Sequence, residues 1–365
     1  MNRPYQVIVL VSHVPELGGA ERVLLRLGEQ LSDLGIPVKC ITPEGPLYSE
    51  AIAKDNLEVW KIPPLAKKHS DSLWTHIRRC AQANKTVMRA AAPQRAVYVL
   101  NAPRAMVYLC PTVLRNRRRV ICFAHDVYSK KSLSRFVVAL ALTVGVRIVC
   151  VSHAIARSLG RRFEEAVLVL HNPVYVQRFL GGRSPSRKVR LGSVSNIAEW
   201  KGHLFALRAL EPILDSDPEI TYRVYGKALD PAESAYFQML VERLAAVPGA
   251  SYEGYAEEPT QAMLDIDVFV QSSTRPEQPL TLAEAIAAGC AVVVPKGGGE
   301  QEVVRQWPAA FWYERGDVHS FRHALNEAVA SHRIRGVPLG DADFDAWAAG
   351  RDKRSWARAF LKYAG

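Results

Sequence analysis

The sequence has few cysteines, and none of them are paired in the close spacing of metal or redox motifs. The 365-residue chain contains six cysteines without a CxxC or CxxH pattern. Most lie in apolar, strand-like contexts, such as Cys150 within residues 147–151. We interpret them as free thiols buried in a reducing compartment, and we expect no metal site.

Long hydrophobic runs are also missing. The longest, residues 136–146, has 11 residues and is followed by Arg147, whereas a membrane-spanning helix needs about 20 apolar residues. The apolar N-terminal stretch lacks the small-residue cleavage site of a secretory signal, so we interpret it as a first strand. With 48% hydrophobic and 23% charged residues, the composition is that of a globular protein. We expect a cytoplasmic location.

The first half of the chain has few acidic residues. Residues 1–184 contain 27 Lys and Arg against 12 Asp and Glu, whereas residues 185–365 contain 20 against 24. The basic half is either a solvated face or a surface for an anionic partner, namely a membrane surface or a lipid-linked substrate. A membrane partner would make the protein peripheral on the inner face of the cytoplasmic membrane. No helix-turn-helix, RNA-binding or basic-aromatic pattern is present, so nucleic acid is not an expected partner.

Short apolar runs alternate with helical patterns along the whole chain, which predicts parallel sheets covered by helices. The clearest helix spans residues 19–34, where apolar residues recur three and four positions apart. A stretch rich in Gly, Ser and Pro at residues 181–188 is typical of a linker. The expected strands are 6–11, 38–42, 96–100, 120–124, 147–151 and 167–170 before this linker, then 189–194, 221–225, 251–253, 268–271, 291–295 and 311–313.

The alternation predicts the α/β class with two doubly wound, Rossmann-like domains. We expect domains at residues 1–184 and 185–345, followed by a C-terminal helix at 346–365 that packs back on the N-terminal domain. Ligands of such sheets bind outside the carboxyl ends of the strands, so residues that directly follow strands are the candidate functional residues.

The first strand-to-helix turn contains Gly18 and Gly19. Two glycines at the start of a helix allow backbone amides to approach a ligand, and the helix N-terminus favours an anion. A plain glycine-rich turn is the alternative. The turn does not match GxGxxG, which disfavours a dinucleotide cofactor.

A second candidate site lies in the later half. Leu280 and Thr281 open a helix whose first amides could hold a phosphate, and Glu284 one turn later could accept both hydroxyls of a ribose. Glu277 could address another part of the same ligand. A capping role for Glu277 and a solvated Glu284 are the alternatives. Lys201 follows a strand and could neutralise a diphosphate, although an ordinary surface lysine would have the same pattern.

Other chemistry is less well supported. The sequence 265–267 (Asp-Ile-Asp) resembles a metal-binding motif of another transferase class, but it lies where a helix joins a strand, and we expect a structural role. His13, His153 and His171 follow strands and are either structural or part of the site. The chain contains no G-x-S-x-G motif, which disfavours a hydrolase.

Taken in order, several motifs carry a family resemblance. They are GGAER at 18–22, AHD at 124–126, VSHA at 151–154, HNPV at 171–174, WKG at 200–202, Tyr225-Gly226 and PEQPLTLAEAIAAG at 276–289. Together they resemble the group 1 retaining glycosyltransferases, the nucleotide-sugar-dependent family four. That resemblance implies the GT-B fold, in which two Rossmann-like domains, an acceptor-binding and a nucleotide-sugar-binding one, face a central cleft.

The resemblance also implies roles for individual residues. It places the glycine pair, chiefly the Gly19 amide, beside the donor diphosphate and the acceptor, and Lys201 on that diphosphate. Glu284 would hold the ribose, the amides of Leu280 and Thr281 would contact phosphate or sugar, Gly226 would lie beside the nucleobase, and His125 would touch the transferred sugar.

Two positions depart from the family pattern. Asn196 stands where the family usually has an arginine that shares the diphosphate charge. Glu277 lies seven residues before Glu284 rather than eight, so the loop is one residue shorter and the sugar-recognising role of Glu277 is open. Both positions stay on our candidate list, Asn196 for donor binding and Glu277 for catalysis with His125 and Lys201.

The resulting expectation is a retaining, metal-independent hexosyltransferase without a cofactor. It would use a nucleoside diphosphate sugar, with a UDP-sugar favoured over a GDP-sugar, and a glycan or lipid-linked acceptor in bacterial surface polysaccharide synthesis. The alternatives are a GT-B nucleotide-sugar epimerase, which needs no acceptor, and a non-catalytic nucleotide-sugar-binding relative.

Overall fold

The chain forms two compact units in a computed structural model that describes residues 6–66, 71–92, 95–129, 131–173, 183–276, 278–337, 341–349 and 352–365. The first unit comprises Met1–Pro173 and Lys353–Gly365, and the second comprises Val174–Asp352. The boundaries expected from the sequence, after residues 184 and 345, differ from this division. Arg183 is already part of the second unit, because its guanidinium donates to the carbonyls of Met263 and Leu264.

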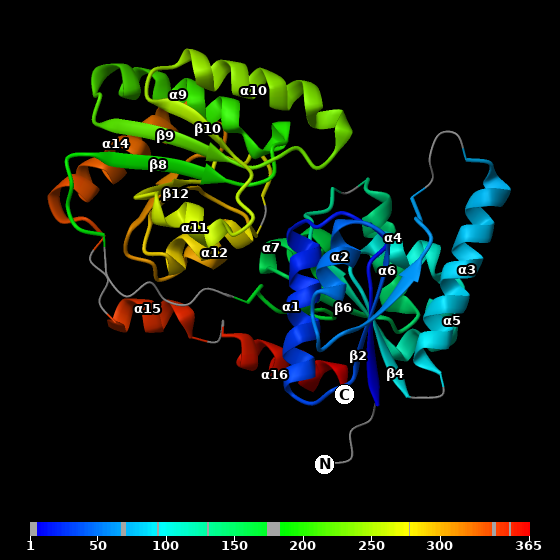
Figure 1. Ribbon diagram of the computed structural model, residues 1–365. Helices are drawn as coiled ribbons and strands as arrows, with labels where there is room; N and C mark the ends of the chain where they lie inside the picture. The colour runs from blue at the N-terminus through cyan, green and yellow to red at the C-terminus, as the bar shows by residue number, and fades with distance from the viewer. Residues whose placement is uncertain are drawn as a thin grey trace. The chain divides into compact units, whose positions relative to one another are not determined.

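The first unit contains a seven-stranded parallel sheet in the order β3-β2-β1-β4-β5-β6-β7. Figure 1 labels β2, β4 and β6 of this sheet. Its inner strands are continuous apolar runs, and all five residues of β1, β4 and β5 are buried, as expected of a parallel sheet covered on both faces. The strands are β1 (Val7–Val11), β2 (Val38–Pro43), β3 (Glu58–Ile62), β4 (Ala96–Leu100), β5 (Val120–Ala124), β6 (Arg147–Cys150) and β7 (Leu168–Val169).

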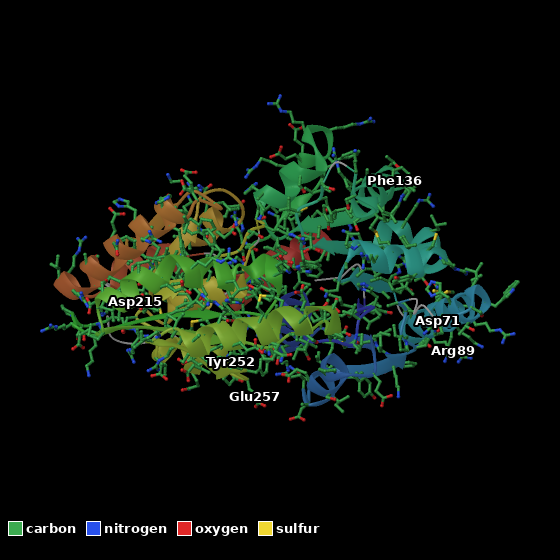
Figure 2. The ribbon with its side chains drawn as sticks, turned by 90° about the horizontal axis from the view of Figure 1, so that it is seen from above. Asp71, Arg89, Phe136, Asp215, Tyr252 and Glu257 are labelled. Carbon is green, nitrogen blue, oxygen red and sulfur yellow. The ribbon has the colours of Figure 1, made fainter. Side chains whose placement is uncertain are left out.

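The helices of the first unit bury one face each. On α1 the apolar residues spaced three and four apart, including Val23, Leu27 and Leu31, are buried. By contrast, Phe136 on α6 lies at the surface and is 65% exposed (Figure 2). The helices are α1 (Gly19–Asp33), α2 (Pro46–Ile52), α3 (Leu73–Ala91), α4 (Pro103–Tyr108), α5 (Cys110–Asn116), α6 (Leu133–Thr143), α7 (His153–Leu159), α8 (Arg161–Glu164) and α16 (Lys353–Ala364).

The C-terminal helix α16 packs on the sheet of the first unit. Phe360 is fully buried, and its ring stacks on Phe123 of β5 with 6.1 Å between centroids. Arg147 of β6 donates to the carbonyls of Tyr363 at 2.5 Å and Ala364 at 3.0 Å. These contacts satisfy carbonyls that the end of a helix leaves without intrahelical donors. The last helix of the chain is therefore a structural part of the first unit.

The second unit contains a six-stranded parallel sheet in the order β10-β9-β8-β11-β12-β13. Its strands are β8 (Val189–Val194), β9 (Ile220–Tyr225), β10 (Ala250–Gly254), β11 (Val268–Val270), β12 (Ala291–Pro295) and β13 (Ala310–Tyr313). Its helices are α9 (His203–Ser216), α10 (Ser234–Ala246), α11 (Pro259–Leu264), α12 (Leu280–Ala287), α13 (Glu300–Val304), α14 (Val318–Arg335) and α15 (Asp341–Ala348), and a 3-10 turn, η2 (Glu199–Lys201), precedes α9.

The Asp-Ile-Asp sequence has the structural role expected of it. Both oxygens of the Asp267 carboxylate accept hydrogen bonds from the guanidinium of Arg190, at 2.8 and 3.0 Å. The backbone amide of Arg190 donates to the same carboxylate at 2.9 Å. These bonds lower the pKa of Asp267 against the effect of its burial, which is the largest influence and raises it. The carboxylate fastens β11 to the start of β8.

Both sheets have one point where the strand order reverses, between β1 and β4 in the first unit and between β8 and β11 in the second. In open parallel sheets the ligand crevice opens at the carboxyl ends of the strands beside such a point. The confirmed two-sheet α/β architecture therefore marks one candidate site in each unit. Among the described residues, none of the helices has the length and apolar character needed to cross a membrane.

Candidate functional site

In the first unit, the candidate site is the turn between β1 and α1. Gly18 is the N-cap of α1, and its amide donates to Oε2 of Glu21 at 3.2 Å. Gly19 is the first helical residue and is exposed. The Gly18 N–H thus already donates to Glu21, whereas Gly19 lies at the positive end of the helix dipole. Of the two expected glycines, Gly19 fits the anion-facing role better.

His125, which directly follows β5, is joined to this turn by Asn101. Asn101 follows β4, and its Nδ2 donates to Oε1 of Glu21 at 2.9 Å, while its Oδ1 lies 3.2 Å from Nε2 of His125. Burial lowers the pKa of His125 to about 4, so the imidazole is neutral at pH 7. Sequence reasoning selected His125 but assigned no role to Glu21 or Asn101. The three-residue spacing from Gly18 to Glu21 is typical of a capping box, and it was the sequence feature that could have indicated a role for Glu21 at this turn.

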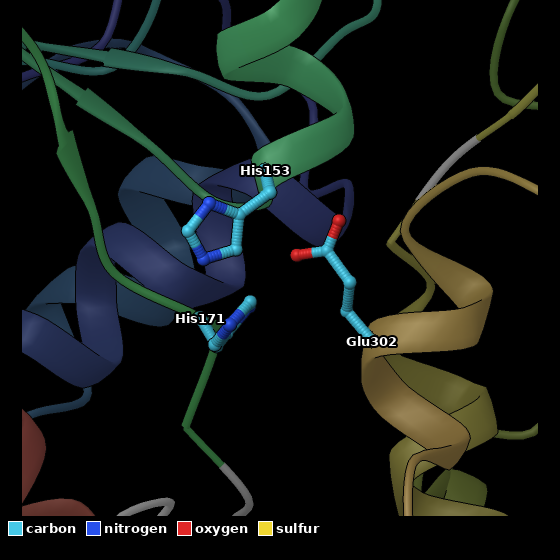
Figure 3. A group of neighbouring side chains, drawn as sticks. All are labelled: His153, His171 and Glu302. Carbon is cyan, nitrogen blue, oxygen red and sulfur yellow. The ribbon is translucent and has the colours of Figure 1, made fainter. Parts of the chain in front are cut away.

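Three further histidines lie near the carboxyl ends of strands in the first unit. Burial and the neighbouring Arg104 lower the pKa of His13 to about 4, and its ring lies 5.8 Å from that of Tyr108. His153 and His171 meet edge to face with ring centroids 5.8 Å apart (Figure 3). The third residue labelled there, Glu302, belongs to α13 of the second unit.

In the second unit, Lys201 ends the 3-10 turn η2 and is held against the loop after β11. The hydroxyl of Ser272 donates to the Lys201 carbonyl at 2.9 Å, and the amide of Thr274 donates to the Trp200 carbonyl at 2.8 Å. Gly202 makes this approach possible. It has a φ of +74°, and a Cβ there would lie 2.1 Å from the Ser272 carbonyl oxygen. Residues 200–202 (WKG) therefore bring their backbone into close contact with the loop after β11, and they also supply the charge of Lys201.

The Lys201 ammonium lies over the Trp200 ring, 4.2 Å from its centroid. Lys201 also lines a small pocket together with Ser193, Ser195, Gln271 and other residues at the ends of β8 and β11. His203 lies on the same pocket, and its Nε2 is 3.0 Å from the Ser195 hydroxyl. Burial first, and Lys201 second, lower the pKa of His203 to about 4. The pocket thus contains one cation, neutral polar groups and a neutral imidazole.

Asn196 and Gly226 follow the neighbouring strands β8 and β9. Gly226 has a φ of +154°, and a Cβ there would lie 1.9 Å from the Ser195 carbonyl oxygen. Only glycine therefore allows this approach of the two strand ends. The Gly226 carbonyl accepts a hydrogen bond from Tyr252 at 2.7 Å. Asn196 is half-buried beside this contact and brings no charge to it.

The helix α12 begins at Leu280, as the sequence predicted. Its N-cap is Pro279, which has no side-chain acceptor, so no cap side chain satisfies the first amides, among them those of Leu280 and Thr281. Glu284 is 5% exposed on the same helix. Its burial disfavours the solvated-helix alternative. Glu277 lies outside the described residues.

Arg315, which follows β13, joins the loops at this edge, and sequence reasoning did not identify it. Its guanidinium donates to the carbonyls of Ser273 at 2.5 Å and Gly297 at 3.3 Å. It also donates to the fully buried carboxylate of Glu300 at 2.9 Å. Ser273 and Gly297 lie in the loops after β11 and β12, and Glu300 begins α13, so one side chain contacts both loops and the helix that follows the second. No sequence motif near residue 315 predicts these hydrogen bonds.

Solved structures share this architecture over nearly the whole chain. HepE from Anabaena, solved with UDP and glucose, has a TM-score of 0.78 at 20% identity, covering 98% of this chain and 99% of its own. Sucrose-phosphate synthase from Thermosynechococcus elongatus has a TM-score of 0.75 at 16% identity, covering 98% of both chains. The lipopolysaccharide outer core galactosyltransferase WaaB, in its apo form, has a TM-score of 0.71 at 13% identity, again covering 98% of both chains. These likenesses show the GT-B fold.

Family models match both units. The model described as glycosyl transferases group 1 matches residues 181–335, and that of glycosyltransferase family 4 matches residues 17–178. No curated protein matches the sequence. The chain belongs to the group 1, family 4 glycosyltransferases, and it is a glycosyltransferase.

Proposed function

We propose that this protein transfers a hexose from a UDP-sugar to a glycan or lipid-linked acceptor in bacterial surface polysaccharide synthesis, with retention and without a metal ion. The observation that carries the proposal is the placement of Lys201 at the reversal point of the second sheet, where backbone contacts to Ser272 and Thr274 hold its turn. Support for the donor comes from HepE, which was solved with UDP-glucose. Support for the pathway comes from WaaB, named as a lipopolysaccharide galactosyltransferase.

The departing diphosphate must be stabilised as the anomeric bond breaks, since negative charge builds on it. Lys201 supplies a point charge, and the amides of Leu280 and Thr281 supply the positive end of a helix. Glu284 accepts hydrogen bonds from the ribose, and Gly226 borders the base. With this charge provided by the protein, the leaving group needs no metal ion. A diphosphate oxygen accepts the proton of the attacking acceptor hydroxyl on the same face, which gives retention.

Arg275 supplies the charge that Asn196 lacks. Its guanidinium carbon lies 6.0 Å from the centroid of the Trp200 ring, the ring that also carries the Lys201 ammonium. The Arg275 carbonyl accepts a hydrogen bond from Arg315 at 3.1 Å, so its loop is anchored to the same edge of the sheet. A second cation beside Lys201 thus comes from the loop after β11, not from the segment after β8.

The decisive experiment compares Lys201→Ala with Lys188→Ala, since Lys188 directly precedes β8, whereas Lys201 lies in the turn η2 that follows its carboxyl end. Lys201→Ala lowers transfer or hydrolysis of the UDP-sugar by roughly 100-fold, or about 2–4 kcal/mol, as expected for one lost electrostatic donor. Lys188→Ala leaves the rate unchanged. Equal rates in both variants contradict the assignment. Conversion of the donor to an isomer without acceptor indicates an epimerase, and UDP-sugar binding without turnover indicates a non-catalytic relative.

We also place the acceptor side of the protein on an anionic membrane surface. Leu133, Phe136 and Leu140 lie three and four residues apart on α6 and are 73%, 65% and 53% exposed, so they form one apolar stripe. Lys131 precedes the helix, and Arg118 lies beside Gly145 just after it. An apolar stripe with basic residues at both ends matches a headgroup layer of negative charge.

Vesicle sedimentation tests this surface. The wild type binds vesicles that contain anionic lipid, and binding falls as salt rises. Phe136→Ser weakens binding, whereas Met239→Ser, which changes an apolar residue on the second unit that is 50% exposed, does not. Binding that is indifferent to lipid charge contradicts the proposal.

A further inference from the structure

Glu21, Asn101 and His125 form a chain of hydrogen bonds across three segments of the first unit. Glu21 lies in the first turn of α1, and the other two residues directly follow β4 and β5. Glu21 accepts with both oxygens, from the Gly18 amide through Oε2 and from Nδ2 of Asn101 through Oε1. A carboxylate at this position presents one acceptor oxygen to each of the two donors, whereas an amide side chain of the same size would turn its NH2 group, itself a donor, toward one of them.

This arrangement determines the orientation of the Asn101 side chain. Burial raises the pKa of Glu21, and the N–H groups of Gly18 and Asn101 that donate to it act in the opposite direction and favour the carboxylate. As a carboxylate Glu21 accepts and does not donate, so the amide nitrogen of Asn101 faces Glu21 and its carbonyl oxygen faces His125. That oxygen lies 3.2 Å from Nε2 of the imidazole. Since a carbonyl oxygen only accepts, Nε2 must carry the hydrogen.

The state of the second ring nitrogen then follows. Burial lowers the pKa of His125 to about 4, so at neutral pH the ring carries one hydrogen. With that hydrogen on Nε2, the other nitrogen, Nδ1, has a free lone pair and is an acceptor. The ring also stacks on Phe123, with 5.8 Å between centroids, which limits its rotation.

We propose that Glu21 and Asn101 are positioning residues that hold His125 in its Nε2–H tautomer, so that Nδ1 accepts a hydrogen bond from a hydroxyl of the transferred sugar. The inference rests on the proposed function only for the identity of that hydroxyl. The tautomer itself is a property of the folded chain. Glu21 therefore acts on the reaction through Asn101, without touching the substrate.

Nitrogen NMR of the full chain labelled with 15N-histidine tests the tautomer directly, because protonated and unprotonated ring nitrogens resonate in separate regions. The His125→Gln spectrum identifies the two His125 signals by their loss. In the wild type they report the Nε2–H form alone. In Glu21→Gln the amide oxygen faces one donor and the NH2 group faces the other, so the side chain at position 21 no longer fixes the orientation of the Asn101 amide and both tautomers are populated.

Two further variants separate this interpretation from a general loss of structure. Glu29→Gln makes the same change two turns later on α1, where Glu29 pairs with Lys54 at 3.1 Å, and leaves the His125 signals unchanged. Glu21→Gln combined with Asn101→Asp exchanges the amide and the carboxylate. The amide at position 21 then donates to the carboxylate at position 101 and accepts from Gly18, and that carboxylate accepts from Nε2 of His125. The double variant restores the Nε2–H form.

The proposal is overturned if wild-type His125 carries its hydrogen on Nδ1, or if Glu21→Gln retains the Nε2–H form alone. It is also overturned if the double variant populates both His125 tautomers to the same extent as Glu21→Gln alone. The sugar-directed role requires that Glu21→Gln lower donor turnover about tenfold with UDP affinity unchanged, and that the double variant recover it. A tautomer change without loss of turnover overturns that role. The hexosyltransferase assignment itself depends on the Lys201→Ala experiment, so the two can fail separately.

Discussion

Replacing Arg315 with methionine tests how the candidate donor site is held together. The substitution keeps much of the side-chain volume but removes the guanidinium that bonds to the Ser273, Arg275 and Gly297 carbonyls and to the Glu300 carboxylate. The Glu300 side chain is fully buried and the Arg315 side chain is 17% exposed. Removing one partner of a buried ion pair costs about 3–5 kcal/mol, because the remaining charge stays in a poorly solvating interior.

Urea unfolding of the full chain, followed by tryptophan fluorescence and circular dichroism, measures this cost. Arg243→Met is the matched control, since Arg243 pairs with Glu211 at 2.6 Å on the surface of the same unit. An exposed pair contributes at most about 1 kcal/mol. Adding Glu300→Gln to Arg315→Met removes the buried charge and recovers at least half of the lost stability.

The reasoning is refuted if Arg315→Met costs no more than Arg243→Met. It is equally refuted if the double variant is no more stable than the single one, because the buried charge would then not be the cause. UDP binding provides a second readout. Loosening the loops after β11 and β12 weakens UDP binding in Arg315→Met under conditions where the variant is still folded.

Three other predictions concern both units. Gly202→Ala forces a Cβ to within 2.1 Å of the Ser272 carbonyl oxygen at a φ of +74°. The variant is therefore less stable by about 1–3 kcal/mol and turns over the donor more slowly. An alanine variant with the wild-type melting temperature and rate would contradict the close contact. His13, His125 and His203 have pKa values lowered from 6.5 to about 4, so the unfolded state binds more protons between these values. The free energy of unfolding therefore rises with pH between about 4 and 6.5, and each histidine removes about 3 kcal/mol of it once the pH has fallen below this window. Urea midpoints that do not change between pH 4.5 and 7 would exclude this contribution of the histidines. Glu284→Gln weakens UDP affinity about tenfold, or about 1.4 kcal/mol, with little change in melting temperature; loss of both in parallel would indicate a structural role.

The sequence was sufficient to predict the parallel sheets because their inner strands are continuous apolar runs. The edge strand β3 (Glu58–Ile62) was not predicted, since Glu58 and Lys61 are exposed and the strand lacks a uniform apolar pattern. The C-terminal segment illustrates a second limit. Trp347 and Trp356 are equally buried, but they lie in α15 of the second unit and α16 of the first. An apolar pattern shows that a helix face is buried, not which sheet covers it.

The candidate-site residues also divide into those that the sequence alone could indicate and those that it could not. Gly18, Lys201 and Leu280 could be selected because each opens or precedes the α-helix that comes next along the chain after a strand. Arg315 could not, since its acceptors are carbonyls and a carboxylate some 15 to 42 residues away in sequence. Asn101 also lacked a signal, because its importance depends on a carboxylate 80 residues earlier in the chain.

Backbone contacts make the position of the Lys201 turn independent of most of the side chains around it. The Lys201 turn is positioned by the Ser272 hydroxyl on its own carbonyl and by the Thr274 amide on the carbonyl of Trp200. Gly202 and Gly226 are required because carbonyl oxygens approach them, whatever side chains surround them. A fold held in this way tolerates change at side chains that only add charge, as at Asn196, while the path of the backbone stays the same.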